Sequence, residues 1–330
     1  MKIINIIDSL ELNGGSTMFL EMTAAMQKYW SDDEICPYVV SKTGRFGREG
    51  LVSGSFAPSH GVKPQLYDYA TFEKEVVPKT RKALVFHHVL GYTKNIVFHK
   101  SCKYVVINHT ATNVKRLPGF AAYRLVCVSG YFANKVKKEN ESKRKLRAFV
   151  ILNGCEDYFH IEPSVSDSRF VIGRCQRIVP TKFRNEKINV KNTVQYIIGP
   201  VRDEISDILP KNAEIFGPIF DMKEKLPIIR SFDVYLHGAP RPEGCSMAIL
   251  EALSCGVPVI AKDVGGGVRE VIKSGVNGFL YQKTPELRKI LRDLSSDPVY
   301  LAKIKKQVRE DFLARFHIKH MLKQYKGLTK

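Results

Sequence analysis

Short apolar runs alternate with polar or helix-compatible stretches along the whole chain. In the first half these runs cover residues 2–7, 38–41, 83–87, 104–107, 125–128 and 149–152, and in the second half residues 170–173, 196–198, 214–216, 234–236 and 257–261. Each run has the length of a buried strand rather than of a buried helix. After the first run, Met18, Met22 and Met26 recur at helical spacing. The pattern predicts an α/β fold with two doubly wound parallel sheets, each in a Rossmann-like domain.

A break in this rhythm indicates where the two domains meet. Proline and serine cluster near residues 159–167, after a sharp turn. We therefore expect an N-terminal domain over residues 1–158 and a C-terminal domain over residues 159–310. Residues 311–330 are basic and helix-compatible, and we expect them to form a C-terminal helix that crosses back to the N-terminal domain.

The chain is strongly basic, with 52 Lys and Arg residues against 33 Asp and Glu residues and a formal net charge of +19. Residues 35–150 carry 21 basic and 6 acidic residues, whereas residues 1–34 carry 2 and 6, and residues 151–330 carry 29 and 21. Scattered lysines can simply keep a surface solvated. A basic excess concentrated in the N-terminal half favours an anionic partner, such as nucleic acid, an acidic glycan or a membrane surface.

The cysteine, histidine and apolar content excludes several other classes of protein. The 7 cysteines include no CxxC pair and the 9 histidines no HExxH pair, so we expect reduced thiols and no metal requirement. His87 and His88 are adjacent, and on a strand they would point to opposite faces. No stretch of about 18 apolar residues is present, and the N-terminus lacks the apolar region of a secretory signal. We expect a cytoplasmic protein, with a peripheral position at a membrane surface as the alternative.

Residues 233–280 combine several features of a ligand site. Ser246 is positioned as the N-cap of a helix over residues 247–254, and the backbone N–H groups at such a helix start attract phosphates or sugar hydroxyls. Glu243 precedes this helix and Glu251 lies within it, so both carboxylates can line one crevice. Three glycines at 265–267 open onto a second helix start. The ordered combination is much more specific than any one feature.

This segment closely resembles the donor site of the retaining GT-B glycosyltransferases, in particular the large family 4 of the glycosyl transferases group 1. The family pattern E-G-x-x-x-x-x-x-E-A, followed by G-x-P-V-I, corresponds to residues 243–252 and 256–260. The resemblance implies a GT-B architecture, with two Rossmann-like domains facing a central cleft and a nucleotide sugar bound mainly by the C-terminal domain. It implies that Glu251 accepts hydrogen bonds from the nucleotide ribose and that Glu243 lies near the donor sugar. The backbone N–H groups implied to hold the sugar and the distal phosphate are those of Gly244, Cys245, Ser246 and Met247.

Residues 171–183 resemble a second element of the family, the phosphate clamp at the end of a strand. Arg177 and Lys182 have the five-residue separation of that clamp, and Arg174 is a weaker match. The resemblance implies that Arg177 and Lys182 neutralise the departing diphosphate without a metal ion. Phe183 stands where the family usually has glycine, which leaves the geometry of this loop open.

The N-terminal half resembles the family less specifically. Asn13, Gly14, Gly15 and Ser16 form a glycine turn that is similar to the loop that approaches the donor phosphate, and Gly15 is the expected contact. His109 follows an apolar run at the position of the family's active-site histidine, which the resemblance implies contacts the donor sugar. Taken alone, a histidine at the end of a strand is more often structural, and the family register is what favours a functional role here.

Together these features predict a retaining glycosyltransferase that uses a nucleoside-diphosphate sugar. The expected donor is a UDP-sugar, with a GDP-sugar as the alternative. The basic N-terminal half favours an anionic acceptor, and we lean to hydroxymethylated pyrimidine bases in DNA. One alternative is a peripheral-membrane glycosyltransferase acting on a lipid-linked, lipopolysaccharide or polysaccharide glycan. The others are a nucleotide-sugar isomerase, which needs no acceptor, and a non-enzymatic basic nucleic-acid-binding module.

Overall fold

The computed structural model describes residues 1–10, 14–41, 56–89, 96–109, 124–139, 148–163, 167–178, 183, 186–200 and 209–329. The chain divides into two compact units. Unit 1 comprises Met1–Gly154 and Ile318–Lys330, and unit 2 comprises Cys155–His317. The C-terminal segment therefore belongs to the same unit as the N-terminal residues.

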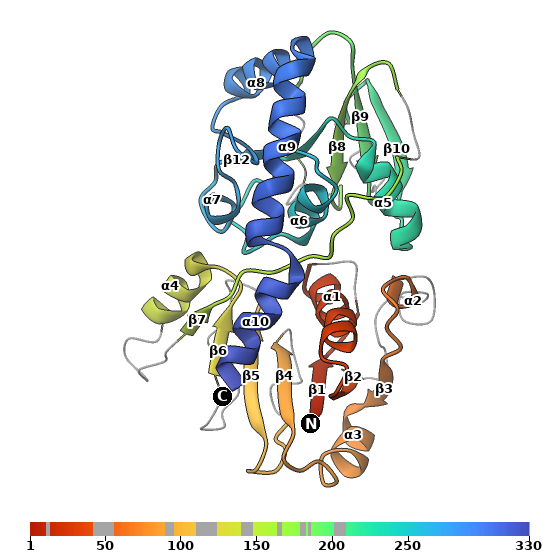
Figure 1. The fold of residues 1–330 in the computed structure, drawn as a ribbon, viewed down its shortest axis with the longest axis vertical. Helices are drawn as coiled ribbons and strands as arrows, with labels where there is room; N and C mark the ends of the chain where they lie inside the picture. Colours follow the sequence, from red (N-terminus) through yellow and green to blue (C-terminus); the bar gives the residue numbers. More distant parts are fainter. Residues whose placement is uncertain are drawn as a thin grey trace. The chain divides into compact units, whose positions relative to one another are not determined.

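Unit 1 is built on a sheet that has seven strands among the described residues (Figure 1). The strands are β1 (Lys2–Ile7), β2 (Glu34–Ser41), β3 (Gln65–Asp68), β4 (Leu84–Val89), β5 (Lys103–Asn108), β6 (Arg124–Cys127) and β7 (Ala148–Val150). The helices are α1 (Gly14–Tyr29), α2 (Phe56–Ser59), α3 (Tyr69–Glu75), α4 (Gly130–Glu139) and α10 (Ile318–Thr329). All the strand pairings are parallel, in the order β3-β2-β1-β4-β5-β6-β7. The strand order reverses between β1 and β4, as in a doubly wound Rossmann-like domain.

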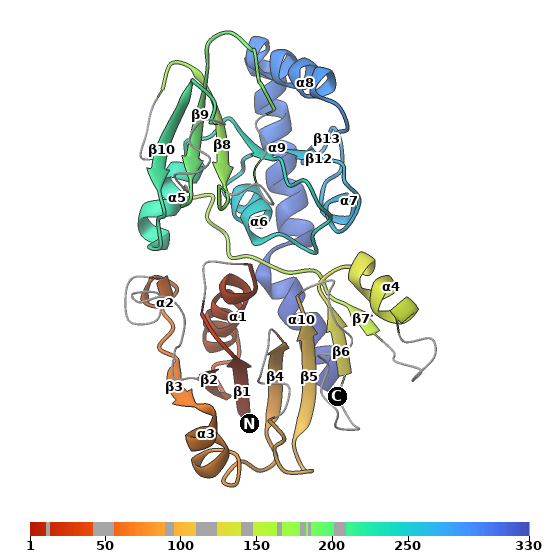
Figure 2. The same ribbon diagram turned by 180° about the vertical axis from the view of Figure 1, so that it is seen from behind.

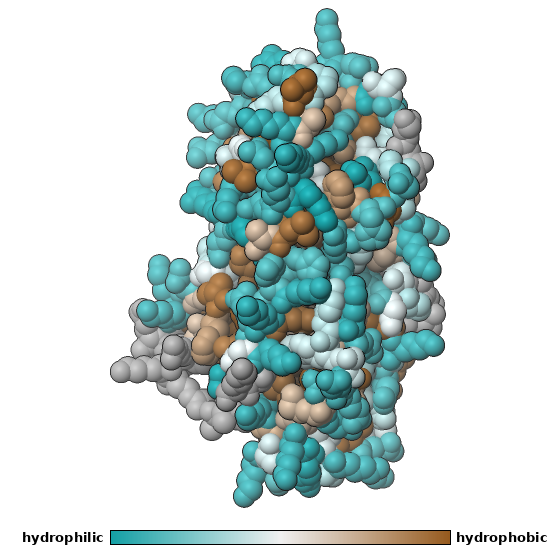
Figure 3. Space-filling view, viewed as in Figure 1, coloured by the Kyte–Doolittle hydropathy of each residue, from teal (hydrophilic) through white to brown (hydrophobic). Residues whose placement is uncertain are grey.

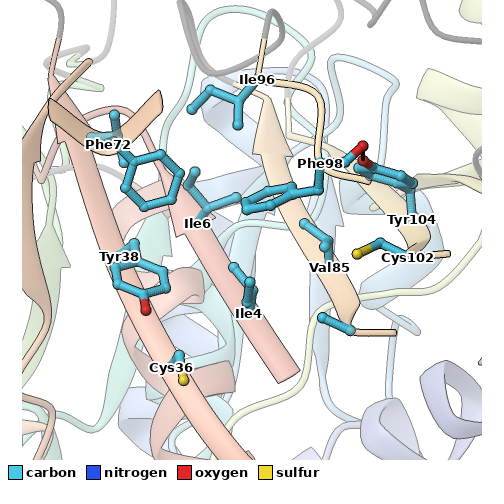
Figure 4. Packing of buried hydrophobic residues seen from close by; sticks show 12 residues of the cluster. Ile4, Ile6, Cys36, Tyr38, Phe72, Val85, Ile96, Phe98, Cys102 and Tyr104 are labelled. Carbon is cyan, nitrogen blue, oxygen red and sulfur yellow. Dashed lines mark hydrogen bonds between the residues drawn. The ribbon is translucent and has the colours of Figure 1, made fainter. Parts of the chain in front are cut away.

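Strand alternation builds a separate apolar layer on each face of this sheet. On one face, Ile4 and Ile6 of β1 belong to a buried cluster with Tyr38 of β2 and Val85 of β4 (Figure 4). Phe72 of α3 closes this layer, with its ring centroid 5.1 Å from that of Tyr38. Aromatic side chains bury large areas, and Phe98 extends the layer with its ring centroid 6.0 Å from that of Phe72.

The opposite face of the same sheet is covered by α1 and α10, as both ribbon views show (Figures 1 and 2). The ring of Phe86 on β4 contacts Trp30, next to α1, and Tyr325 of α10, at centroid distances of 6.2 and 5.6 Å. Residue 154 must be small here, because a Cβ on Gly154 would lie 2.8 Å from the Cα of Ile318. This close approach and the buried Tyr325 place the C-terminal helix in unit 1.

Unit 2 repeats the architecture with a sheet of six strands among the described residues. The strands are β8 (Phe170–Cys175), β9 (Thr193–Ile198), β10 (Ala213–Gly217), β11 (Val234–His237), β12 (Val259–Lys262) and β13 (Gly278–Tyr281). The helices are α5 (Met222–Arg230), α6 (Met247–Ser254), α7 (Val268–Val271), α8 (Thr284–Ser296) and α9 (Pro298–Arg315). The order is β10-β9-β8-β11-β12-β13, again all parallel, and it reverses between β8 and β11.

The structure confirms the predicted fold class, two Rossmann-like domains with doubly wound parallel sheets. The run at 257–261 becomes a strand only from Val259, because Pro258 cannot donate a backbone hydrogen bond at the strand start. Two strands, β3 and β13, were not predicted. Both are four residues long, and their sequences QLYD and GFLY carry too few β-branched residues to stand out.

On the face drawn in Figure 3, hydrophobic side chains form small, separate areas among hydrophilic ones. Among the described residues, every helix is too short or too polar to cross a bilayer. All seven cysteines are buried free thiols. The charged stretch after the fourth helix, residues 140–147, lies outside the described residues.

Candidate functional site

The candidate site of unit 2 lies where the strand order reverses. Chain connections leave β8 and β11 toward opposite faces of the sheet, and in open α/β sheets ligands bind at the carboxyl ends of two such strands. Arg177 follows β8 and is exposed. Glu243 and Ser246 follow β11. The topology therefore brings three of the predicted residues to the same edge of the same sheet.

A pocket opens at this edge, lined by the end of β11, the loop that follows it, the start of α6 and the end of β12. Its lining residues are His237, Ala239, Arg241, Glu243, Gly244, Ser246, Ile249, Lys262, Val264, Val268 and Val271. The predicted residues Glu243, Gly244 and Ser246 are thus brought together, while Cys245 and Met247 are buried beside them. The lining includes the cations Arg241 and Lys262, the latter with its Nζ 3.9 Å from Oε1 of Glu186, together with the carboxylate of Glu243.

The start of α6 has the predicted position. The helix begins at Met247, and Ser246 has the extended backbone of an N-cap. The Ser246 side chain, however, makes no capping hydrogen bond to the described residues of the helix. The first N–H groups of any helix lack intrahelical partners, so this end can receive a ligand oxygen.

Glu243 is held in place by the end of β11 and by the loop before α7. Its Oε2 lies 3.2 Å from Nε2 of His237, and its backbone carbonyl accepts a hydrogen bond from the N–H of Gly267 at 2.9 Å. Gly266 has φ +81°, and a Cβ at that position would lie 2.7 Å from the Glu243 carbonyl oxygen. Glycine at 266 therefore serves to let the loop before α7 approach the loop before α6.

Glu251 occupies a different environment from Glu243. Its side chain is 2% exposed, does not line the pocket, and its Oε2 lies 2.6 Å from Nζ of Lys225 on α5. Burial disfavours the Lys225 ammonium, but the Glu251 carboxylate outweighs burial, and the pKa of Lys225 lies above its usual value. The pair is therefore a buried ion pair that fixes one oxygen of Glu251.

Of the clamp candidates, Arg174 lies within β8 and is structural, whereas Arg177 follows β8 and is exposed. Arg174 is fully buried: its Nε donates to Oε1 of Gln195 at 3.2 Å, and its guanidinium lies 5.0 Å from the centroid of the Phe183 ring. Phe183 itself is buried with Ile178 and Ile197. A phenylalanine in place of the usual glycine thus anchors this loop in the core. The second predicted clamp cation, Lys182, lies outside the described residues.

The predicted residues of unit 1 lie at the edge where its own strand order reverses. Gly15 is buried in the first turn of α1, which begins at Gly14, so the prediction of a turn over residues 13–16 is wrong for residues 14–16. Glycine is tolerated there because the first helical turn has few intrahelical hydrogen bonds to lose.

His109 follows β5, and its Nε2 lies 2.8 Å from Nδ1 of His88 on β4. Burial lowers the pKa of His109 to about 4, so its imidazole is neutral at pH 7.

Sequence reasoning missed the partners of the predicted residues. Lys225 gives no sequence signal, because a lysine in an amphipathic helix usually faces solvent. Lys262 and His237 each end a strand beside the pocket, and strand-end polar residues in a parallel sheet are the signal that could have found them. Among the described residues, no group of three or more His, Cys, Asp or Glu side chains could hold a metal ion.

Comparison with known proteins agrees with this geometry. Residues 187–311 match the family of glycosyl transferases group 1. The matched segment contains the loop with Glu243, the whole of α6 and the pocket. The resemblance inferred from the sequence is confirmed for this family.

Two curated relatives match shorter segments. An uncharacterized glycosyltransferase of Methanocaldococcus jannaschii is 27% identical over 123 residues, 36% of this chain and 30% of that protein. The GtfA subunit of a UDP-N-acetylglucosamine–peptide N-acetylglucosaminyltransferase of Streptococcus agalactiae is 30% identical over 90 residues, 27% of this chain and 18% of that protein. The matches thus span less than a third of either relative.

Solved glycosyltransferases share the whole fold. HepE of Anabaena, solved with UDP and with UDP-glucose, is 17% and 18% identical, with a TM-score of 0.73 in both cases and coverage of 100% of this chain and 99% of HepE. TarM of S. aureus is 12% identical with a TM-score of 0.74, over 99% of both chains. WaaG, a glycosyltransferase involved in lipopolysaccharide biosynthesis, is 12% identical with a TM-score of 0.62, over 94% of both chains. The chain therefore has the GT-B glycosyltransferase fold.

Proposed function

We propose that this protein transfers a sugar from a nucleoside-diphosphate sugar, with a UDP-sugar as donor, to an acceptor hydroxyl with retention of configuration. The observation that carries the proposal is the pocket at the carboxyl ends of β11 and β12, which joins Glu243, the start of α6 and the cations Arg241 and Lys262. HepE, with the same fold, was solved with UDP and UDP-glucose, which supports a uridine nucleotide as the ligand.

In the proposed reaction, the bond between the sugar C1 and the phosphate oxygen breaks while a bond from C1 to the acceptor oxygen forms. The acceptor proton passes to an oxygen of the departing diphosphate, so the products are the glycoside and the nucleoside diphosphate. The protein supplies position and charge. N–H groups at residues 244–247 hold the distal phosphate, Arg177 and Lys182 neutralise it, and no metal ion is required.

Glu251 contributes to the proposed site as the acceptor of ribose hydroxyl hydrogen bonds, with Lys225 fixing one of its oxygens. Glu243 is proposed to contact the donor sugar, because it lines the pocket beside the helix start. In unit 1, Gly15 and His109 are proposed to contact the donor phosphate and the donor sugar.

Donor binding is tested by calorimetry of UDP with Glu251→Gln. The matched control is Glu224→Gln, an exposed carboxylate on α5. We expect about a tenfold or greater loss of UDP affinity for Glu251→Gln, because a charged acceptor contributes about 1.5–3 kcal/mol. Equal affinity of the two variants would show that the ribose contact is wrong.

For the acceptor, we propose an anionic molecule that the basic residues of the N-terminal half recognise. The charge favours DNA with hydroxymethylated pyrimidines, while the similarity to WaaG favours a lipopolysaccharide or another glycan. Both are tested together by incubating the protein and UDP-glucose with hydroxymethylated DNA, unmodified DNA and lipopolysaccharide cores, followed by mass spectrometry. A hexose gain on only one substrate identifies the acceptor class, and the anomeric proton signal of the product in NMR tests retention.

A further inference from the structure

A chain of buried polar side chains crosses the centre of unit 1 and ends at His109. Asn5 lies on β1, the strand next to β4, and its side chain points to the sheet face opposite Ile4 and Ile6. Its Nδ2 lies 2.8 Å from the Thr23 hydroxyl on α1, and its Oδ1 lies 2.9 Å from Nε2 of His88.

This series of hydrogen-bonded side chains continues at both ends. The Thr23 hydroxyl donates to the Phe19 carbonyl at 2.7 Å, and the Nδ1 of His88 lies 2.8 Å from Nε2 of His109. Asn5, Thr23 and His88 are all fully buried. No water can reorganise around groups buried to this degree, so each donor must face an acceptor.

The direction of every hydrogen bond follows from the Phe19 end. A carbonyl can only accept, so the Thr23 hydroxyl donates to it and receives a hydrogen bond from the amide NH₂ of Asn5. The carbonyl oxygen of Asn5 therefore faces His88, and Nε2 of His88 must carry the proton. A neutral imidazole has one N–H, so Nδ1 of His88 is an acceptor and Nε2 of His109 is its donor.

The opposite direction is unfavourable at one identifiable point. If the Asn5 amide were turned over, its oxygen would lie about where Nδ2 now lies, 3.5 Å from the Phe19 carbonyl oxygen. Two oxygens without a proton between them repel each other, and Thr23 has one proton for two acceptors. Neither imidazole is doubly protonated at neutral pH. Burial and the neighbouring histidines hold the pKa of His88 well below its usual value, and burial lowers the pKa of His109 to about 4.

We propose that His88 is a positioning residue that fixes His109 as the Nε2–H tautomer, so that the ligand-binding nitrogen of His109 is Nδ1 and it acts only as a hydrogen-bond acceptor. A His109 fixed in this way binds a hydroxyl group and rejects a phosphate or carbonyl oxygen. The inference rests on the proposed function, in which His109 contacts the donor sugar, and it names the sugar hydroxyl as the group recognised.

The first test reads the tautomers in the wild-type protein. In the full-length protein labelled with ¹⁵N-histidine, long-range proton–nitrogen NMR identifies the protonated nitrogen of each ring, with His109→Gln and His88→Asn used to assign the two residues. We expect protonated Nε2 and unprotonated Nδ1 in both His88 and His109. Protonated Nδ1 in His109 would overturn the proposal.

The second test measures turnover. His88→Leu removes the acceptor for His109, and His88→Asn retains an acceptor oxygen near Nδ1. We expect His88→Leu to lower kcat/KM for sugar transfer about tenfold, as for the loss of one oriented hydrogen bond, with His88→Asn recovering part of this loss. Unchanged UDP affinity in both variants shows that the donor site is intact. Unchanged kcat/KM in His88→Leu would overturn the positioning role.

The two proposals fail in different ways. If the wild-type protein binds no UDP and transfers no sugar, the proposed function is wrong whatever the tautomer. If it binds UDP and transfers sugar but His109 carries its proton on Nδ1, the hydrogen-bond chain runs in the other direction and only the role of His88 is wrong.

Discussion

Replacing Lys225 with methionine should destabilise unit 2, because the Glu251 carboxylate then stays buried without its cation. Nζ of Lys225 lies 2.6 Å from Oε2 of Glu251, and the side chains are 16% and 2% exposed. Removing one partner of such a pair costs about 3–5 kcal/mol, whereas replacing both partners by apolar side chains is often nearly neutral. We expect K225M to lose about 3–5 kcal/mol and the double variant K225M/E251M to recover most of that loss.

The assay can separate the two units because the chain has a single tryptophan. Trp30 belongs to unit 1, so its fluorescence during urea unfolding reports that unit. Amide hydrogen exchange in α6 reports unit 2. K225M should lower the protection of α6 amides while the Trp30 transition stays in place. Lys223→Met, at an exposed position of the same helix, is the matched control.

Two results would refute this reasoning. One is a loss of less than about 1 kcal/mol in K225M, which would mean that the pair is solvated like a surface salt bridge. The other is a double variant whose loss equals the sum of the two single losses, because residues that do not interact have additive effects.

Three further predictions concern other parts of the fold. Gly266→Ala should weaken UDP binding in calorimetry, because the new Cβ would meet the Glu243 carbonyl oxygen at 2.7 Å and push the loops before α6 and α7 apart. Unchanged UDP affinity would show that the loop before α7 does not contribute to the donor site. Stability should fall as the pH drops from 7.5 to 5, because unfolded His109 binds a proton near pH 6.5 and the folded residue, with its pKa lowered to about 4, does not. That difference gives a loss of about 2 kcal/mol by pH 5, and urea unfolding of His109→Gln should show a shallower pH dependence than the wild type. Gly173→Ala should lower the unfolding midpoint of unit 2, because its Cβ would lie 1.9 Å from the fully buried Phe232 ring; overpacking typically costs about 1–3 kcal/mol, and a wild-type midpoint would mean that the ring can move aside.

Local sequence chemistry was enough to find the elements and part of the site. Ser246 marked the start of α6 to the residue, because a cap and a helix start are decided by neighbouring residues. The apolar runs located the strands, since a parallel sheet buries both of its faces. The spacing of Glu243 and Glu251 revealed the resemblance to the glycosyl transferases group 1, because that pattern lies within one contiguous segment.

Contacts between distant segments could not be read in the same way. Whether Glu251 is paired depends on Lys225, 26 residues away on another helix. The direction of the hydrogen bonds that end at His109 depends on His88 and Asn5. A sequence states which groups can donate or accept, but only the packing of strands against helices decides which of them meet without water. The sequence therefore determined the fold class of this protein and its resemblance to the glycosyl transferases group 1. The tertiary structure decided which charges are buried and which nitrogen of His109 carries its proton, because both depend on burial and on partners that chain order does not encode.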